Sequence, residues 1–392
     1  MPNTQAEEIS FEFIDSTAAL QRACAQLSDQ PYLAVDTEFV REKTYYPVLC
    51  LIQIASPNYC ACIDPLAIDD LSPLADILLN AQTTKIFHAA RQDLEVLQQS
   101  LGAIPTPVFD TQIAATLLGL GDQIGYANLV HHFLNIQLAK GHARTDWERR
   151  PLSDEQLSYA ADDVRYLITL YPLMRQALTD RGRLDWLDED FAALTSPQLY
   201  HNDPPQQWMR VSGVQKLKGV QLAILQQLAA WREQQAQQHN KPRKWILSDD
   251  ILLAIAMQAP HKSEQLERIR GIPPATVQRH GQTLLDLITQ AKTLPKNDWP
   301  TLSRRRALTP NQEALLEALM AIIKLAASAQ QINATALSTR SDLEALISGE
   351  SDIPLLHGWR HGIAGHQVLA FMQGQTHLAV TAQGTLTATS ND

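Results

Sequence analysis

Apolar and polar positions in the first half of the chain follow two periods in turn, one typical of strands and one typical of helices. Three short apolar runs with few residues between them predict an antiparallel meander, at residues 32–36, 48–55 and 59–63. Further strands are predicted at residues 85–88 and 108–110, and helices at residues 71–79, 90–101 and 155–179. The pattern therefore predicts an α/β domain with a mixed sheet.

The second half of the chain changes character after Pro197, Pro204 and Pro205, which mark a linker. Helical patterns follow at residues 214–238, 251–259, 263–269 and 274–292. Beyond a second boundary near Pro295 and Arg304, a similar set follows at residues 309–330, 341–348 and 351–372. We expect a domain at residues 1–200 and two small all-α domains at 206–295 and 300–380, loosely duplicated. The last twenty residues are expected to fray.

The composition is that of a globular protein, and no apolar run approaches the roughly 20 residues that cross a bilayer. The N-terminus is polar and acidic, which is unlike a secretory signal, so a cytoplasmic location is expected. No heptad pattern is visible, and we expect a monomer. The four cysteines lack metal-ligand spacing, so reduced thiols in a core are expected: Cys24, Cys50, Cys60 and Cys62.

Charge is distributed unevenly along the chain. The net charge of −10 argues weakly against a nucleic-acid partner. Residues 1–209, however, hold 13 Lys+Arg and 28 Asp+Glu, whereas residues 210–295 hold 12 and 6. Phosphate binding needs only a local positive surface, so the basic segment is either a nucleic-acid contact or an ordinary charged surface.

Asp36 and Glu38 end the first apolar strand. Residues two apart on a strand point to the same face, so the two carboxylates lie side by side and repel each other unless a cation intervenes. Taken alone, a solvated strand end explains this tripeptide better.

Two later acidic positions also have ordinary explanations. Asp93 lies at a predicted helix start, five residues after His88, where a carboxylate suits the helix dipole. Tyr159 and Asp163 are four apart and share a helix face, as a surface pair would. The combination of all four acids is far less expected by chance than any one of them.

Together these positions resemble the DEDD exonuclease superfamily, in its tyrosine-bearing subgroup, and the surrounding sequence is similar to bacterial ribonuclease D. The likeness spans residues 30–180. It is carried by the segments at residues 35–41, 44–47, 51–53, 88–89, 93–96, 110–112, 144–147 and 159–161. Residues 222–231, 242–249 and 266–271 resemble the helicase-and-RNase-D C-terminal (HRDC) domain, and residues 309–372 resemble a diverged second copy.

The resemblance implies a ribonuclease-H-like fold and hydrolysis of RNA from its 3′ end by two divalent cations, Mg²⁺ or Mn²⁺. It implies that Asp36 bridges both cations, that Glu38 and Asp163 hold the one beside the nucleophile, and that Asp93 positions the other through water. Tyr159 then orients the attacking water, because an ordinary Tyr pKa near 10 makes a poor base. The products are 5′-mononucleotides.

The resemblance also implies substrate contacts at Thr37, Phe39 and His88 in the first domain and at Arg243 and Lys244 in the HRDC-like segment. For the neighbouring Trp245, a core anchor is favoured over a base-stacking role. Further candidate phosphate contacts are Lys216, Lys218, Lys241, Arg268, Arg270 and Arg279. The segment 138–144 departs from the family pattern near His142, where substrate contacts are expected.

The implied substrates are transfer-RNA precursors and other structured small RNAs. One alternative is a DNA 3′-5′ exonuclease, because the same acids serve proofreading domains. Another is a non-catalytic RNA-binding protein, against which the presence of all four acids and Tyr159 counts. Zinc binding by His357, His361 and His366 is disfavoured by their spacing.

Overall fold

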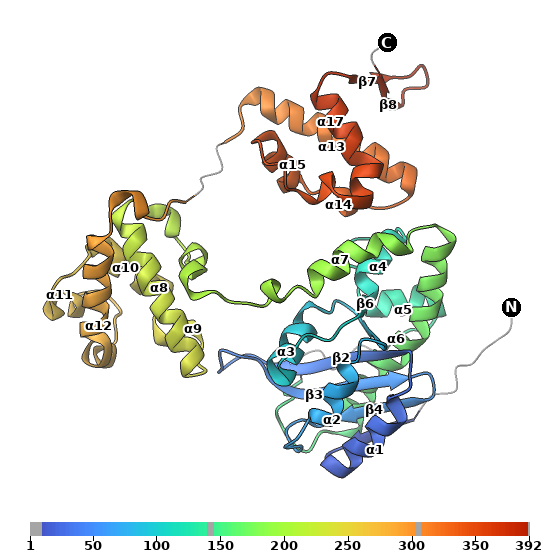
Figure 1. Cartoon of the computed structure of the whole chain (residues 1–392), viewed down its shortest axis with the longest axis horizontal. Coiled ribbons are helices and arrows are strands. Elements are labelled where there is room, and N and C mark those ends of the chain that lie inside the picture. The colour runs from blue at the N-terminus through green and yellow to red at the C-terminus, as the bar shows by residue number, and fades with distance from the viewer. Residues whose placement is uncertain (1–9, 139–144, 303–306, 391–392) are drawn as a thin grey trace. The chain divides into compact units, whose positions relative to one another are not determined.

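The computed structural model describes residues 10–138, 145–302 and 307–390. The segment near His142 and the arginines at 304–306 therefore lie outside the described residues. The chain divides into two compact units, each described by itself below. The first comprises residues 1–39, 49–199 and 307–392, and the second comprises residues 40–48 and 200–306. Figure 1 shows the elements of both.

A six-stranded mixed sheet forms the centre of the first unit, in the order β1-β4-β3-β2-β5-β6. β1 runs parallel to β4, β3 antiparallel to β4, and β5 parallel to both β2 and β6. The strands are β1 (Phe11–Ile14), β2 (Tyr32–Val40), β3 (Val48–Ser56), β4 (Tyr59–Ile63), β5 (Thr84–Phe87) and β6 (Val108–Asp110). Nearly every residue of β3 and β4 is buried, as expected for central strands of a covered sheet.

Helices pack against this sheet, and the longest, α6, contacts β1, β4 and β5. The helices of this part are α1 (Thr17–Leu27), α2 (Ser72–Leu78), α3 (Arg91–Leu101), α4 (Thr111–Leu117), α5 (Tyr126–Leu134), α6 (Asp154–Asp180) and α7 (Leu187–Leu194), with short 3₁₀ turns η1 (Leu184–Trp186) and η2 (Pro197–Leu199). The predicted α/β domain with a mixed sheet is confirmed. Strand β1 was not predicted, because four residues with two of them exposed carry little periodicity.

The second unit is helical around one apolar core, in which Trp208, Leu225 and Leu252 are buried. Its elements are η3 (Pro204–Arg210), η4 (Val214–Lys216), α8 (Val220–Gln238), α9 (Arg243–Ile246), α10 (Asp249–Gln258), α11 (Ser263–Glu267), α12 (Pro274–Thr293) and η5 (Lys296–Asp298).

The segment that follows β2 belongs to this helical unit. The Tyr45 hydroxyl donates to the buried Glu233 carboxylate of α8, and the Asn240 side chain accepts from the backbone N–H of Tyr45 at 3.1 Å. Arg243 also lies over the Tyr45 ring, 4.9 Å from its centroid. The helical unit is therefore completed by a loop of the chain that comes directly after the acidic strand.

Residues 307–390 form a second helical core, with Leu319, Ile323 and Leu343 buried. It contains α13 (Pro310–Gln330), α14 (Ala334–Leu337), α15 (Arg340–Ile347), η6 (Pro354–Leu356), α16 (Gly358–Arg360), the π-helical η7 (His361–Gly365) and α17 (His366–Met372). The expectation that the C-terminus frays was wrong, because β7 (Thr376–Val380) pairs antiparallel with β8 (Leu386–Ser390).

This core packs on the end of the α/β part within the first unit. The Trp186 and Trp359 rings stack with centroids 4.4 Å apart, and Arg360 donates to both carboxylate oxygens of Asp190, at 2.8 and 3.0 Å. Across the described residues, no helix has both the length and the apolarity needed to span a membrane. All four cysteines are buried, as expected for thiols in a core.

Candidate active site

Strand β2 supplies two of the acids that the sequence singles out. The alternation along β2 places Asp36 and Glu38 on one face and the buried Thr37 on the other. The three residues before Asp36 are completely buried, so they anchor the strand in the core and fix the position of both carboxylates.

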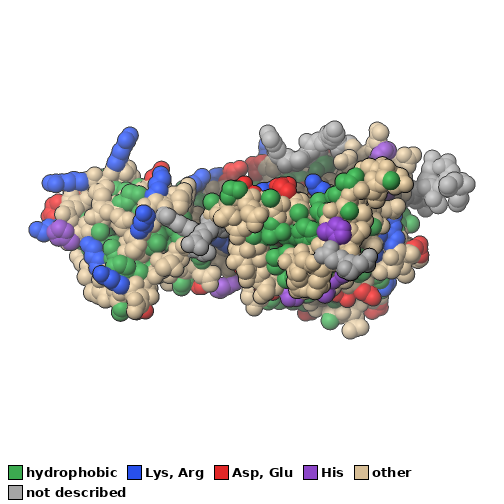
Figure 2. All heavy atoms as spheres, turned by 90° about the horizontal axis from the view of Figure 1, so that it is seen from above, with side chains coloured by type: hydrophobic (Ala, Val, Ile, Leu, Met, Phe, Trp, Pro, Cys, Tyr) green, Lys and Arg blue, Asp and Glu red, His purple; other side chains and the backbone are tan. Residues whose placement is uncertain are grey.

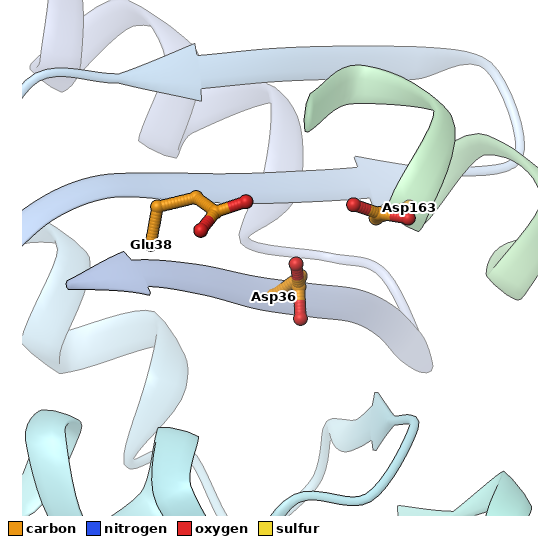
Figure 3. A group of neighbouring side chains, drawn as sticks. All are labelled: Asp36, Glu38 and Asp163. Atoms are coloured by element: carbon orange, nitrogen blue, oxygen red, sulfur yellow. The ribbon is translucent and has the colours of Figure 1, made fainter. Parts of the chain in front are cut away.

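Helix α6 supplies the third acid. The helix begins with a capping box, in which Ser153 accepts from the Gln156 N–H and the Gln156 side chain accepts from the Ser153 N–H. The small side chains of Ala160 and Ala161 are fully buried, which lets this part of α6 lie close to the sheet. Asp163 therefore faces the strand, as Figure 3 shows.

Asp36, Glu38 and Asp163 converge into one cluster, in which a carboxylate oxygen from each lies within 4.8 Å of the others. Within the part of the chain that the structure describes, this is the group of acidic, His or Cys side chains close enough to share a metal ion. Three carboxylates from two separate elements approach so closely only at an electrostatic cost, which a hard divalent cation would offset.

The cost appears in the ionisation of the cluster. Burial, followed by the charges of Asp93, Asp163 and Glu38, raises the pKa of Asp36 well above its ordinary value. Burial and the neighbouring carboxylates raise the pKa of Glu38 to about 8 and that of Asp163 to about 7. Without a cation, the protein holds these acids partly protonated near neutral pH.

Asp93 lies at the edge of this group rather than inside it. It occupies the first turn of α3, is 7% exposed, and its Oδ1 accepts a 2.5 Å hydrogen bond from the Thr37 hydroxyl. Burial raises the pKa of Asp93 to about 7, and its charge in turn raises the pKa values of the three clustered acids. Asp93 is thus coupled to the cluster through its charge but stands back from it.

The turn that leads to Asp93 is fixed by Asp110, the last residue of β6. The Asp110 carboxylate accepts from the backbone N–H groups of Ala89 at 3.1 Å and Ala90 at 2.8 Å, and it also caps α4. Ala89 adopts a φ of +61°, which is unfavourable for a residue with a Cβ atom. Asp110 lies in a family-like segment, but its positioning role was not predicted.

Tyr159 lies one helical turn before Asp163, and its phenol is partly buried. Burial and the charges of Asp163, Glu38 and Asp36 raise its pKa to about 12. The phenol therefore keeps its proton at neutral pH and is a poor general base. Tyr126 was not singled out, yet its hydroxyl donates to the Asp162 carbonyl at 2.9 Å, and burial beside Asp163 and Asp36 raises its pKa strongly.

The predicted substrate contacts fall into different settings. Thr37 is buried with its hydroxyl bonded to Asp93, so its side chain supports a carboxylate instead of facing solvent. Phe39 is half-buried on β2. His88 Nδ1 lies 3.0 Å from the Thr111 hydroxyl and Nε2 lies 3.1 Å from the Ile124 carbonyl, so its polar atoms are engaged within the protein.

The two predicted contacts in the helical unit also differ. The Arg243 guanidinium is bonded to Glu233, through Nε at 2.5 Å and Nη2 at 2.7 Å, whereas the Lys244 side chain is exposed. Trp245 is 56% exposed, so the expectation of a core anchor was wrong. It lies in the short helix α9, where the next residue, Ile246, packs against the apolar core while the indole stays exposed.

Comparisons with known proteins agree with this site. Residues 11–179 match a family described as 3′-5′ exonuclease, and residues 221–288 match the HRDC domain. The chain is 40% identical to a ribonuclease D from Zymomonas mobilis over 372 residues, covering 94% of this chain and 95% of that protein. It is equally identical to a ribonuclease D from Sphingobium indicum, covering 94% of this chain and 96% of that protein. The crystal structure of Escherichia coli RNase D superposes with a TM-score of 0.83 at 30% identity, covering 93% and 99% of the two chains.

Proposed function

The chain belongs to the ribonuclease D family and is a 3′-5′ exoribonuclease, and from that premise we propose that it hydrolyses RNA with two divalent cations and matures the 3′ ends of transfer-RNA precursors. The observation that carries the proposed mechanism is the convergence of Asp36, Glu38 and Asp163 within 4.8 Å. Asp93 is the fourth acid, and its charge acts on the cluster by raising the pKa of Asp36.

The donor set fits hard cations such as Mg²⁺ or Mn²⁺, because carboxylate oxygens are the ligands that these ions prefer. Asp36, Glu38 and Asp163 would hold them, with Asp93 acting through water. Bound cations supply an activated water and neutralise the charge that develops on the leaving 3′ oxygen. The raised pKa values of Glu38 and Asp163 support this assignment, because a cation would remove their mutual repulsion.

The remaining roles fall to the protein's own side chains. With its raised pKa, the Tyr159 phenol keeps its proton and orients the attacking water by hydrogen bonding instead of abstracting a proton. Thr37 holds Asp93 in place through the 2.5 Å hydrogen bond. Asp110 fixes the turn before α3 and so limits the movement of Asp93. Hydrolysis then releases 5′-mononucleotides one at a time.

The substrate assignment rests on likeness. The Escherichia coli structure is described as an exoribonuclease involved in structured RNA processing, which supports transfer-RNA precursors and other structured small RNAs as substrates here. We further propose a cytoplasmic monomer with an exonuclease domain at residues 1–200 and helical domains at 206–295 and 300–380. The first helical domain holds the RNA, through residues that include Arg243 and Lys244.

A direct test uses metal-stripped protein and a 5′-labelled transfer-RNA precursor with a 3′ tail. Cleavage is followed with and without Mg²⁺, beside the Asp163→Asn variant and a DNA oligonucleotide of matched sequence. We expect a ladder that shortens from the 3′ end, with metal, in the unsubstituted protein and on RNA.

Other outcomes separate the alternatives. Equal cleavage of DNA would replace this proposal with a general 3′-5′ exonuclease. Full activity without metal, or in Asp163→Asn, would contradict the role of the acidic cluster.

A further inference from the structure

A cavity of about 290 Å³ lies in the helical unit, and cationic side chains from η3, α8 and α9 surround it. Its charged and hydroxyl lining consists of Arg210, Arg232, Arg243, Lys244, Ser248 and Asp249. We propose that this cavity binds a backbone phosphate of the RNA strand whose 3′ end is hydrolysed. The proposal rests on the RNA substrate proposed above and names the place where the helical unit holds it.

Arg232 gives the cavity wall a positive charge that is fixed in place. The residue is only 5% exposed, and its Nη1 donates to the Leu247 carbonyl at 3.0 Å and to Asp249 Oδ1 at 2.7 Å. Its buried Nε has no hydrogen-bond partner among the described residues. Arg232 lines the cavity, so its positive charge is fixed there and attracts a phosphate without having to reorganise.

The two carboxylates beside the cavity are already engaged. Asp249 Oδ1 accepts from Arg232, and its Oδ2 accepts from the Ser212 backbone N–H at 2.8 Å. Glu233 is completely buried and accepts from Arg243 and from the Tyr45 hydroxyl. These acids therefore fix Arg232 and Arg243 in position and leave little repulsion for an incoming anion.

The surplus positive charge is carried by Arg210 and Lys244, which are both exposed. Arg210 donates to the amide oxygen of Asn202 at 3.3 Å, a neutral partner that leaves its charge uncompensated. The cavity thus has four positive side chains, which are the fixed Arg232 and Arg243 and the exposed Arg210 and Lys244. Only two carboxylates, Asp249 and Glu233, lie beside them, so an excess of positive charge remains that suits a phosphodiester. Figure 2 shows Lys and Arg side chains gathered on the surface of the α8–α12 part.

The exposed Trp245 is the feature that favours a nucleotide over a free anion as the ligand of the cavity. It follows Lys244 directly in α9 and is 56% exposed, a setting that offers an indole face to a base. Stacking of a base on such a ring contributes about 1–3 kcal/mol irrespective of base identity. A single strand that places a phosphate in the cavity thus has an aromatic platform on the same short helix.

The test measures RNA binding by the full-length chain, with Asp163→Asn in every sample so that the RNA stays intact. A labelled single-stranded RNA is titrated by fluorescence anisotropy at several salt concentrations. Arg210→Ala and Lys244→Ala are each expected to weaken binding about fivefold and to reduce the salt slope by about 0.7, the loss of one phosphate contact. Trp245→Ala should weaken binding and leave the slope unchanged.

The control is Lys262→Ala, which removes one exposed positive charge of the same unit away from the cavity. An equal loss in this control, or unchanged binding in Arg210→Ala and Lys244→Ala, would overturn the phosphate site. If inorganic phosphate at the same concentration as the RNA displaces the RNA, the cavity is a site for the free ion and the proposal is overturned. Hydrolysis is assayed separately with Asp163 intact, so a failure of exonuclease activity is distinguished from a failure of the cavity.

Discussion

The acidic cluster and the basic cavity are opposite in charge but share a design. In each, side chains of one sign are brought together from separate elements, Asp36 with Asp163 in the first and Arg232 with Arg243 in the second. The acids lie within 4.8 Å of one another and leave room for small cations, whereas the cavity of about 290 Å³ is large enough for a phosphate group. The uncompensated charge of each region thus indicates the class of group it would bind, which is a divalent cation at the acids and a phosphate at the cavity.

The two regions differ in what supports them. Among the acids, Asp93 is held by the neutral Thr37 hydroxyl, which leaves its charge for a cation. The arginines are positioned by carboxylates, as Arg243 is by Glu233, and these remove part of the positive charge. Changes at the acids should therefore affect the rate of hydrolysis, whereas changes at the cavity should affect RNA affinity.

The largest expected effect, and the strongest test of this contrast, is that of Asp36→Asn or Asp163→Asn. Each substitution keeps the shape of the side chain but removes a cation ligand, so the hydrolysis rate should fall by about 10³-fold or more while RNA affinity stays close to that of the unsubstituted protein. Single-turnover cleavage and RNA binding measure the two quantities.

The matched control is Asp162→Asn, one position away on α6. Asp162 bonds to Arg165 at 2.8 Å and is not part of the acidic cluster. If Asp163→Asn lowers RNA affinity as well as the hydrolysis rate, the acidic cluster and the basic cavity do not have separate roles.

Tyr159→Phe should have the next largest effect, a rate loss of about 100-fold, because it removes the hydroxyl that orients the water. The measurement is kcat across a range of pH. If the phenol only orients, the loss is the same at every pH, since its pKa of about 12 lies above the accessible range. Tyr171→Phe, a substitution on the same helix where the ring packs against Tyr32 and Phe109, serves as the control. A loss that varies with pH near neutrality would indicate a proton-transfer role instead.

Thr37→Val should cost about tenfold in activity at limiting Mg²⁺, because Asp93 loses the donor that holds it. Excess Mg²⁺ should recover part of the loss, and Thr37→Ser, which restores a hydroxyl, should recover most of it. The readout is the Mg²⁺ concentration that gives half-maximal activity. An unchanged Mg²⁺ requirement in Thr37→Val would show that this hydrogen bond does not support the acidic site.

Much of the acidic site could be predicted from the sequence, because its residues sit on regular elements whose spacing is visible. Asp36 and Glu38 alternate on a strand, and the prediction of a helix at residues 155–179 closely matched α6 (Asp154–Asp180). The support could not be predicted in the same way. The bonds from Asp110 to the Ala89 turn and from Thr37 to Asp93 join segments far apart in sequence, and no periodicity encodes such contacts.

The basic cavity was less predictable for the same reason. Arg243 and Lys244 were singled out as surface contacts, but the pairing of Arg243 with Glu233 depends on how α9 returns to α8. The expectation for Trp245 was wrong because a large aromatic side chain next to apolar positions usually enters a core, whereas in α9 it is Ile246 that packs against the core. Strand β1 and the C-terminal hairpin were missed because short, half-exposed strands leave little pattern.

The smallest expected effect concerns stability, and it tests whether the acidic cluster is an unbalanced charge at all. In unfolded chains Asp and Glu have pKa values of about 4, whereas in the folded protein Glu38 reaches about 8 and Asp163 about 7. At these two acids the folded state therefore binds more protons in this window, and their contribution to stability falls as pH rises from about 4 to about 8. The buried His88 has a lowered pKa and acts in the opposite direction only below about pH 6.5.

Thermal melts of metal-stripped protein are compared at pH 6.5 and pH 8. Burial lowers the pKa of Lys85 to about 8, so this lysine opposes the acids only near the upper end of the window. The acids therefore dominate, and we expect the Tm to be about 3 °C or more lower at the higher pH. Mg²⁺ should remove the difference, because a cation that binds the ionised acids of the folded state stabilises it most where they are ionised. Asp36→Asn should shrink the difference without metal, since it removes an acid whose own pKa is raised well above its ordinary value. Asp162→Asn should shrink it less, because it removes only a neighbouring charge that raises the pKa of Asp163. If the Tm of the metal-stripped protein rises with pH, other groups of the protein already compensate the negative charge of the acids. The acidic cluster would then not differ from the basic cavity, where carboxylates compensate part of the charge.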